Sequence, residues 1–514
     1  MKYQNPVLRG MYPDPSVCRY QDKYYMVCST FQYFPGVPLF ESDDMINWKQ
    51  IGHCLTRPSQ VDLKDIRSSG GIFAPTIRCH NGRFYMVTTN DSFAQNFYVY
   101  TDDIYGEWSE PILVEQDGID PSLFFEGEKT YFISNGSDDK GIGCIQMCEI
   151  DIATGKMLTP SKILWQGTGG RFLESPHLYR FGEYYYLVEA EGGTEYGHMA
   201  NYARSKSIWG PYEAYPNNPV LTNRNLGGYQ LQAAGHGDII EDTHGNWWFI
   251  HLAFRQIHKW HTFHHLGRET CLVPLYWQED GWFTMGTDGT SRLEFELPDT
   301  ISFAKQELSY EKTFENLSTK TDWCFLRTPT NENYRFTEHA LELCGTKVTL
   351  DEPASPTFAA IRQNEFDITL ICDVECGQQE CGISFYMDEM HHYEISVKPD
   401  DTGKTTVFVR QTIGCVSQES EKIKNDNPKV SISIAAEAEQ YHFYLVKDSE
   451  KIHLADAYTR YLSSEAAGGF TGVMIGFYAV NPQETQEWSR FSALSIVHKE
   501  AANNNGIDRN ATKC

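Results

Sequence analysis

The sequence predicts an all-β protein in which a five-bladed β-propeller is followed by a β-sandwich. In the first half of the chain, a phrase of strand-forming residues recurs with a period of roughly 45 to 60 residues, the length of a four-stranded propeller blade. Near residue 300 this phrase stops, and segments with alternating hydrophobicity take its place. No long helical pattern interrupts either half, so both domains are expected to consist of β-strands.

The repeated phrase combines a small or acidic residue, a Pro and an aliphatic run with a later aromatic run. Its copies are Asp14-Pro-Ser-Val, Ala74-Pro-Thr-Ile, Asp120-Pro-Ser-Leu, Ser175-Pro-His-Leu and the looser His236-Gly-Asp-Ile-Ile. Because a polar or glycine turn separates two strand-length runs, each copy predicts a hairpin. A second signature ends in Trp48, Trp108 and Trp209, and it predicts the turn before an outer strand, with the Trp packed between blades.

Five such units fit residues 1–297, the predicted propeller. The segment 297–302 is the predicted junction, and the sandwich is expected over residues 310–498. Period-two strands are predicted there at 365–374, 381–386, 393–397, 406–409 and 430–434. Residues 499–514 are polar and are predicted to be disordered.

Composition narrows the classes of partner. The 514 residues carry a formal net charge of −26 and no basic cluster, which argues against nucleic-acid and anionic-membrane partners. The first residues lack an apolar leader and no window reaches a membrane-spanning length, so we expect a cytoplasmic protein. The 14 Cys are scattered singly, which fits a reduced compartment.

The propeller fold predicts where the functional side chains meet. Every copy of the phrase starts next to the central axis, so residues far apart in sequence converge on one funnel. The converging residues are Asp14, Ala74, Asp120, Ser175 preceded by Glu174, and His236. An Asp before Pro is often only a turn initiator. However, the Ala74 copy indicates that the turn forms without a carboxylate, so Asp14 and Asp120 are predicted to be catalytic.

Six segments carry a resemblance to a known family. They are Tyr12-Pro-Asp-Pro-Ser, Ser29-Thr-Phe-Gln-Tyr-Phe-Pro-Gly-Val, Gly70-Gly-Ile-Phe-Ala-Pro, Gly118-Ile-Asp-Pro-Ser-Leu-Phe-Phe, Glu189-Ala-Glu-Gly-Gly-Thr and Leu266-Gly-Arg-Glu-Thr. Together they resemble glycoside hydrolase family 43, in its branch of β-xylosidases and α-L-arabinofuranosidases. The resemblance covers nearly the whole chain and implies a five-bladed propeller joined to a C-terminal β-sandwich.

The resemblance also implies an inverting mechanism, with Asp14 as general base, Glu174 as general acid and Asp120 as the carboxylate that tunes the acid. Inversion needs the two working carboxyls roughly 6.5–9.5 Å apart, a gap that different blades around one funnel can supply. The chain has Ser175 where the family usually has Gly, and this change would crowd the turn or add a hydroxyl beside the acid. Glu189 and Glu191 stay open as alternatives for the acid.

The family positions around the terminal sugar correspond to Phe31, Phe73, Ala74, Thr194, His236, Arg268 and Phe470. Arg268 is expected to stabilise Asp14 and to bind sugar hydroxyls. Phe470 would close one end of the pocket and restrict cleavage to chain ends; its alternative is a core position in the sandwich. No metal ligand set and no required cofactor are predicted, although a structural calcium near His236 is left open.

A histidine cluster, made of His258, His261, His264 and His265, is interpreted as a pocket-rim loop rather than a zinc site, because no carboxylate or Cys completes a ligand set.

The predicted function is an inverting exo-glycosidase that releases terminal β-1,4-linked xylose, and also α-L-arabinofuranosyl residues, from short xylo-oligosaccharides. One alternative is an enzyme that is mainly an α-L-arabinofuranosidase on the same scaffold. The other is a catalytically silent sugar-binding propeller, which the Ser175 departure favours and the three carboxylates oppose. The expected partner is a small oligosaccharide, and assembly into a homo-oligomer is a further expectation.

Overall fold

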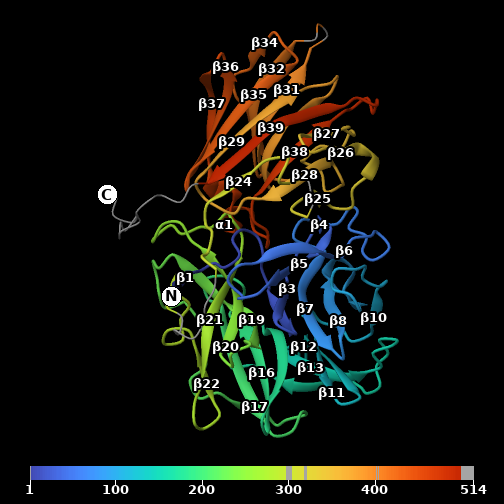
Figure 1. The fold of residues 1–514 in the computed structure, drawn as a ribbon, viewed down its shortest axis with the longest axis vertical. Coiled ribbons are helices and arrows are strands. Elements are labelled where there is room, and N and C mark those ends of the chain that lie inside the picture. The colour runs from blue at the N-terminus through green and yellow to red at the C-terminus, as the bar shows by residue number, and fades with distance from the viewer. Residues whose placement is uncertain (1, 297–303, 318–320, 401, 403, 499–514) are drawn as a thin grey trace.

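The computed structural model describes residues 2–296, 304–317, 321–400, 402 and 404–498. Figure 1 shows two bodies, a propeller below and a sandwich above. Within the described residues, the helical elements are short: η1 (Asp91–Phe93), η2 (Asn331–Asn333), η3 (Thr459–Leu462) and α1 (Ser464–Ala467). The predicted junction at 297–302 and the tail at 499–514 lie outside these ranges. The predicted all-β class is therefore confirmed.

The propeller consists of five four-stranded antiparallel sheets in chain order. The first two are β2 (Ser16–Tyr20), β3 (Lys23–Val27), β5 (Gly36–Ser42) and β6 (Lys49–Leu55), then β7 (Ile72–His80), β8 (Arg83–Asn90), β9 (Gln95–Thr101) and β10 (Ile112–Val114). The third is β11 (Ser122–Glu126), β12 (Lys129–Ser137), β13 (Gly143–Ile150) and β14 (Lys162–Trp165). The last two are β15 (Glu174–Phe181), β16 (Tyr184–Glu191), β17 (Met199–Ser205) and β18 (Glu213–Ala214), then β19 (Leu231–Glu241), β20 (Trp247–Arg255), β21 (Glu269–Trp277) and β22 (Phe283–Met285).

The inner strands of the five blades form a closed ring. β2, β7, β11, β15 and β19 contact one another in this order, and β19 contacts β2 again. The start of the chain fastens to the fifth blade, because β1 (Lys2–Gln4) pairs with β23 (Glu294–Glu296) and Tyr3 Oη donates to the Leu272 carbonyl at 2.7 Å. The first residue of each repeated phrase therefore lies just before or within an inner strand of this ring.

Apolar side chains fill the space between blades. Trp108 is 4% exposed and belongs to a cluster that the first two blades share, as predicted from its position before an outer strand. Between the fourth and fifth blades, Tyr202 stacks on Phe283 with ring centroids 3.8 Å apart. Burying such side chains contributes about 1.5–3 kcal/mol each. This packing keeps the funnel wall in a fixed geometry.

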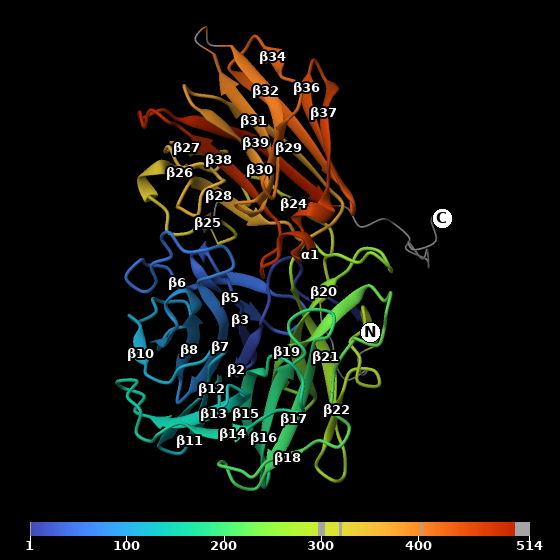
Figure 2. The same ribbon diagram turned by 180° about the vertical axis from the view of Figure 1, so that it is seen from behind.

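The sandwich consists of two antiparallel sheets, seen from behind in Figure 2. One contains β24 (Tyr310–Lys312), β26 (Tyr334–Phe336), β27 (Ala340–Leu343), β29 (Ile368–Glu375), β35 (Lys429–Ala436), β36 (Gln440–Lys447), β37 (Glu450–Tyr458) and β39 (Ser489–His498). The other contains β4 (Tyr33–Phe34), β25 (Cys324–Leu326), β28 (Thr357–Arg362), β30 (Glu380–Asp388), β31 (His391–Pro399), β32 (Thr405–Ile413), β33 (Val416–Glu419), β34 (Ile423–Asn425) and β38 (Met474–Val480). All five predicted period-two segments overlap strands.

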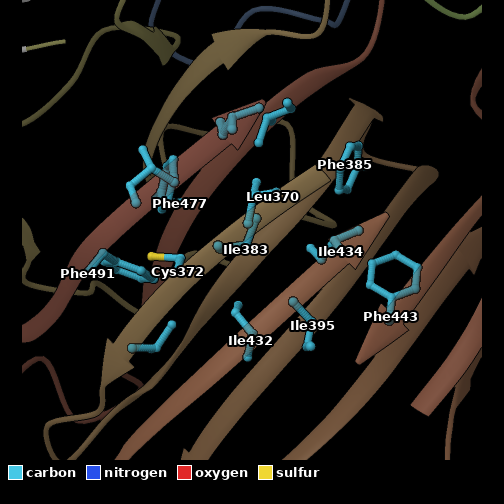
Figure 3. Close-up of a cluster of buried hydrophobic side chains, with 14 of the residues drawn as sticks. Leu370, Cys372, Ile383, Phe385, Ile395, Ile432, Ile434, Phe443, Phe477 and Phe491 are labelled. Atoms are coloured by element: carbon cyan, nitrogen blue, oxygen red, sulfur yellow. The ribbon is translucent and has the colours of Figure 1, made fainter. Parts of the chain in front are cut away.

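The sandwich core lies between these sheets (Figure 3). Along β29, Leu370, Cys372 and Val374 are fully buried, whereas Ile371 between them is 42% exposed. This alternation is the consequence of a strand whose successive side chains point to opposite faces. The period-two pattern in the sequence therefore reports one buried face.

The two domains are joined by backbone pairing and buried polar contacts. β4 leaves the first blade and pairs with β25 at the edge of a sandwich sheet. The fully buried Arg327 donates to the carbonyls of Ile66 in the propeller at 2.7 Å and of Ala354 in the sandwich at 2.8 Å. A Cβ at Gly472 would lie 2.3 Å from the Leu266 carbonyl oxygen, so the sandwich loop rests directly on the loop that carries Arg268.

Among the described residues, no helix has the length and apolar character needed to cross a membrane. Each cysteine in the described ranges is a free thiol, and Cys415 is the one that is exposed.

Candidate active site

The three predicted carboxylates lie at the same end of the inner strands. Asp14 and Asp120 precede β2 and β11, and Glu174 is the first residue of β15. The backbone is left-handed at Asp14 (φ 56°), Asp120 (φ 53°), Ser175 (φ 57°) and His236 (φ 44°). Such a conformation costs a non-glycine residue free energy and concentrates at functional sites. Four blades therefore carry the same strained turn at the mouth of the funnel.

Asp14 is held as a carboxylate. Its side chain accepts hydrogen bonds from Ser29 Oγ at 2.6 Å and from Arg268 Nη1 at 2.7 Å. Burial raises the pKa of Asp14, but the positive charge of Arg268, together with His236 and the Ser29 hydrogen bond, outweighs burial and leaves the pKa below its ordinary value. Asp14 is thus ionised and able to accept a proton at neutral pH.

Glu174 and Asp120 are in the opposite electrostatic situation. Burial, followed by the negative charges of Asp120 and Asp14, raises the pKa of Glu174 well above its ordinary value. Burial and Asp14 raise the pKa of Asp120 to about 7, although the Ser175 backbone N–H donates to Asp120 Oδ2 at 3.1 Å. Both effects favour the protonated form of Glu174, which is the form that a general acid needs.

Ser175 fits into the turn beside the acid. Its positive φ is one that Gly adopts more easily, which explains why Gly would suit this place. The Ser175 Oγ is buried and makes no hydrogen bond with any described residue. The backbone hydrogen bond from Ser175 to Asp120 is made with Ser at this position.

Two neutral histidines line the carboxylates. His236 Nδ1 lies 3.7 Å from Asp14 Oδ1 and 3.9 Å from Asp120 Oδ2, and burial lowers the pKa of His236 to about 4. His198 is a neighbour that the sequence analysis missed. Its Nδ1 donates to the Ala233 carbonyl at 3.0 Å, so the unprotonated Nε2 faces Glu174 Oε1 at 4.0 Å. Burial lowers the pKa of His198 to about 3, which keeps this nitrogen an acceptor.

A cation pairs with Asp238, which lies two residues after His236 in β19. Arg78 donates to both carboxylate oxygens of Asp238, at 2.6 and 3.1 Å, and to His177 Nδ1 at 2.8 Å. In the part of the chain that the structure describes, no group of three or more His, Cys, Asp or Glu residues is arranged to hold a metal. Because Arg78 already donates to both oxygens of Asp238, this carboxylate is not free to bind the calcium ion that the sequence left open near His236.

Three aromatic rings form an apolar wall next to Asp14. The ring centroids of Phe31 and Phe73 are 5.5 Å apart, and Phe470 lies 6.0 Å from Phe31 and 5.9 Å from Phe73. Arg268 lies 5.7 Å from the rings of both Phe31 and Phe470. Phe470 therefore extends from the sandwich to the propeller funnel, as the family resemblance implied, rather than into the sandwich core.

The remaining predicted binding residues lie around this wall. Arg268 Nη1 donates to Thr194 Oγ1 at 2.8 Å, which links the fourth-blade loop to the same guanidinium that holds Asp14. Ala74 is buried in β7 directly after Phe73. Its small side chain adds no polar group to the funnel between the carboxylates.

Comparison with known proteins identifies this arrangement. The sequence profile described as "Glycosyl hydrolases family 43" matches residues 3–283. The chain belongs to this family. A second profile, "Beta xylosidase C-terminal Concanavalin A-like domain", matches residues 311–496. The protein is therefore a glycoside hydrolase with a propeller and a concanavalin-like sandwich, and the recognition made from the six sequence segments is confirmed.

Several family 43 relatives match over almost their full length. The non-reducing end alpha-L-arabinofuranosidase BoGH43B of Bacteroides ovatus is 37% identical over 510 residues, covering 96% of this chain and 95% of that protein. The beta-xylosidase of Bacillus subtilis is 32% identical over 522 residues, covering 93% of this chain and 96% of that protein. The solved structure of a xylan beta-1,4-xylosidase from Bacillus halodurans has a TM-score of 0.87 at 30% identity, covering 97% of this chain and 100% of that chain.

Within this family 43 propeller, Glu191 is already engaged by other groups. It accepts hydrogen bonds from the backbone N–H groups of Thr168 and Gly170, in the loop that precedes Glu174. Glu189 is buried, and burial raises its pKa well above the ordinary value. Of the candidate acids, Glu174 is the one whose pKa responds to both Asp120 and Asp14.

The histidine cluster does not converge on one point. His264 Nδ1 pairs with Glu465 Oε1 at 2.9 Å, whereas His258 Nε2 lies 3.3 Å from Glu439 Oε2. Both partners belong to the sandwich, so this loop of the family 43 propeller contributes to the domain contact.

Proposed function

We propose that the protein is an inverting exo-glycosidase that releases terminal β-1,4-linked xylose from short xylo-oligosaccharides. The observation that carries this proposal is that two carboxyl groups facing one funnel have opposite environments. Arg268 lowers the pKa of Asp14, whereas burial and neighbouring negative charge raise the pKa of Glu174. Carboxyl groups whose environments separate their pKa values in this way form an acid–base pair.

In the proposed reaction, Asp14 removes a proton from a water molecule as the water oxygen forms a bond to the anomeric carbon. The bond from that carbon to the glycosidic oxygen breaks, and Glu174 donates its proton to the departing oxygen. One water is consumed, and the configuration at the anomeric carbon inverts. Asp120 contributes by its negative charge, which raises the pKa of Glu174.

The closed end of the pocket supports exo-cleavage. Phe31, Phe73 and Phe470 pack against one another beside Asp14, and Arg268 lies against two of these rings. The rings offer apolar faces to the C–H groups of a sugar, and Arg268 and Thr194 offer polar groups to its hydroxyls. In the proposed function, this wall closes one end of the sugar site, so a terminal residue binds there and an internal one does not.

A second candidate function is removal of terminal α-L-arabinofuranosyl residues. It is favoured by the 37% identity to a relative named as a non-reducing end alpha-L-arabinofuranosidase, whereas the relative named beta-xylosidase is 32% identical. The same acid, base and aromatic wall would serve both sugars, so the two functions differ only in which glycone fits the pocket.

Rates on paired substrates test the proposal. Purified protein would be assayed on 4-nitrophenyl β-D-xylopyranoside, 4-nitrophenyl α-L-arabinofuranoside and xylobiose, each with and without EDTA. Faster turnover of the xyloside and of xylobiose is the expected result, unchanged by EDTA. A dominant arabinofuranoside rate would replace the xylosidase assignment by the second candidate. Binding of xylobiose without cleavage would contradict both functions.

A further inference from the structure

An exposed aromatic side chain lies in the loop that leads to the acid. The loop between β14 and β15 carries Phe172, two residues before Glu174, and the Phe172 side chain is 59% exposed. Its backbone is left-handed, with φ 53°. Exposure of a large apolar ring to water is unfavourable, and an apolar surface that covers the ring lowers the free energy.

The loop that carries Phe172 is rigidly held. The carboxylate of the buried Glu191 accepts hydrogen bonds from the N–H groups of Thr168 and Gly170. A Cβ at Gly170 would lie 2.3 Å from Glu191 Oε2, so the loop backbone lies directly against this carboxylate. The Gly192 N–H also donates to the Arg171 carbonyl at 2.7 Å. These hydrogen bonds hold the backbone of the loop in place just before Phe172.

The ring packs against the loop that carries Thr194. It packs over Gly193, where a Cβ would approach Phe172 Cδ2 to 3.0 Å. The next residue, Thr194, accepts the hydrogen bond from Arg268, which holds the base Asp14. Phe172 thus stands between the loop that leads to the acid and the loop that binds Arg268.

The chemistry of the proposed reaction decides what would cover this ring. The general acid must contact the glycosidic oxygen, so the departing sugar lies on the side of Glu174 that faces away from the aromatic wall around Asp14. Phe172 lies two residues before the acid in the chain and is not one of the three rings of that wall. The guanidinium of the neighbouring Arg171 lies 4.6 Å from the centroid of the Phe172 ring. From there it can donate hydrogen bonds to hydroxyl groups of the sugar.

We propose that Phe172 forms the subsite for the departing sugar, with its ring against the apolar face of a xylopyranosyl unit and Arg171 on the hydroxyls of that unit. This inference rests on the proposed function, since it assigns the leaving-group side of the same site. Phe172 is a specificity-determining residue here: it selects sugar leaving groups over small ones and takes no part in proton transfer.

The test compares Phe172→Ala, Phe172→Trp and wild type on two substrates that share the glycone. The leaving group of xylobiose is a sugar, whereas the leaving group of β-D-xylopyranosyl fluoride is a fluoride ion. For Phe172→Ala we expect kcat/KM on xylobiose to fall about tenfold, mainly through KM, because one aromatic contact is lost. The fluoride rate is expected to stay within twofold of wild type, and Phe172→Trp is expected to retain xylobiose cleavage.

Tyr276→Ala is the matched control, because Tyr276 is 54% exposed and lies near the far end of β21. This variant should leave both rates unchanged. The inference is overturned if Phe172→Ala lowers both rates equally, which would indicate a structural role, or lowers neither. Failure of the proposed function is seen separately, as wild-type protein that cleaves neither substrate.

Discussion

Arg268 donates a hydrogen bond of 2.7 Å to Asp14, and both side chains are buried. The loop that carries Arg268 rests on the sandwich, because a Cβ at Gly267 would lie 3.0 Å from the Gly472 Cα. The sandwich therefore positions the cation that keeps the proposed base ionised. A domain far along the chain supports the chemistry in this way, in addition to supplying Phe470.

Substitution of the acid should depend on the leaving group. In Glu174→Gln no proton can be donated to the departing oxygen, so kcat on xylobiose should fall by about 10²–10⁴-fold. A nitrophenolate leaves without full protonation, so the loss on the nitrophenyl xyloside should be much smaller. Asp14→Asn should lower both rates alike. Equal losses on both substrates in Glu174→Gln, in protein shown to be folded by circular dichroism, would contradict the assignment of the acid.

The pH dependence of kcat/KM should move when Asp120 is neutralised. The negative charge of Asp120 raises the pKa of Glu174, so removing it in Asp120→Asn lowers the pKa of the acid. The alkaline limb of the pH–rate profile reports loss of the Glu174 proton and should therefore shift to lower pH. A profile measured from pH 4 to 9 that shifts upward, or does not move, would argue against electrostatic tuning by Asp120.

Contact between the domains should be sensitive to one methyl group. In Gly472→Ala the new Cβ would lie 2.3 Å from the Leu266 carbonyl oxygen and 2.5 Å from the Gly267 nitrogen, so the two loops must separate. We expect KM to rise severalfold and thermal stability to fall, because the loops that carry Phe470 and Arg268 both move. Gly52→Ala, where a Cβ meets no atom within 4 Å, is the control and should behave like wild type. An unchanged KM in Gly472→Ala would indicate that this contact with the sandwich does not influence substrate binding.

The ion pair of Arg78 and Asp238 should govern the stability of the fold at acid pH. Burial raises the pKa of Asp238, but Arg78 outweighs burial and lowers it to about 2. Because the folded pKa lies below the ordinary value, this carboxylate stabilises the fold above about pH 4, and the contribution is lost as pH falls towards 2. In Arg78→Met the buried carboxylate is uncompensated, which should cost about 3–5 kcal/mol at pH 7.

Urea denaturation of wild type and Arg78→Met at several pH values measures this cost. The difference in free energy of unfolding should narrow on acidification, because protonation removes the uncompensated charge in the variant. Arg78→Lys, which keeps a positive charge, should recover part of the loss. A difference that is constant from pH 7 to pH 4 would assign Arg78 a packing role only.

The sequence predicted the propeller because each blade repeats the same turn and hairpin, and repetition places Asp14 and Asp120 at equivalent positions. Phe470 and Arg268 followed from local motifs that resemble a family. His198 was not predicted, because its place beside Glu174 depends on how a fourth-blade loop approaches the carbonyl of Ala233.

Contacts between residues far apart in the sequence could not be predicted from the repeated phrases or the hydrophobic periodicity. Arg78 and Asp238 lie in different blades, and nothing local in either segment specifies the other partner. The strand β4 was not predicted as part of the sandwich, because its pairing with β25 joins residues near 33 to residues near 325. Such contacts are set by how blades and domains pack, whereas periodicity reports only which face of a strand is buried.

The central claim is that Asp14 and Glu174 act as base and acid of an inverting reaction. Proton NMR of the xylose first released from 4-nitrophenyl β-D-xylopyranoside, whose only sugar is the glycone, tests this claim most directly, if spectra are recorded before mutarotation mixes the anomers. The account predicts that α-xylose appears first and that β-xylose grows in later. Initial release of β-xylose would show retention of configuration and would contradict the assignment of Asp14 as the base that activates water.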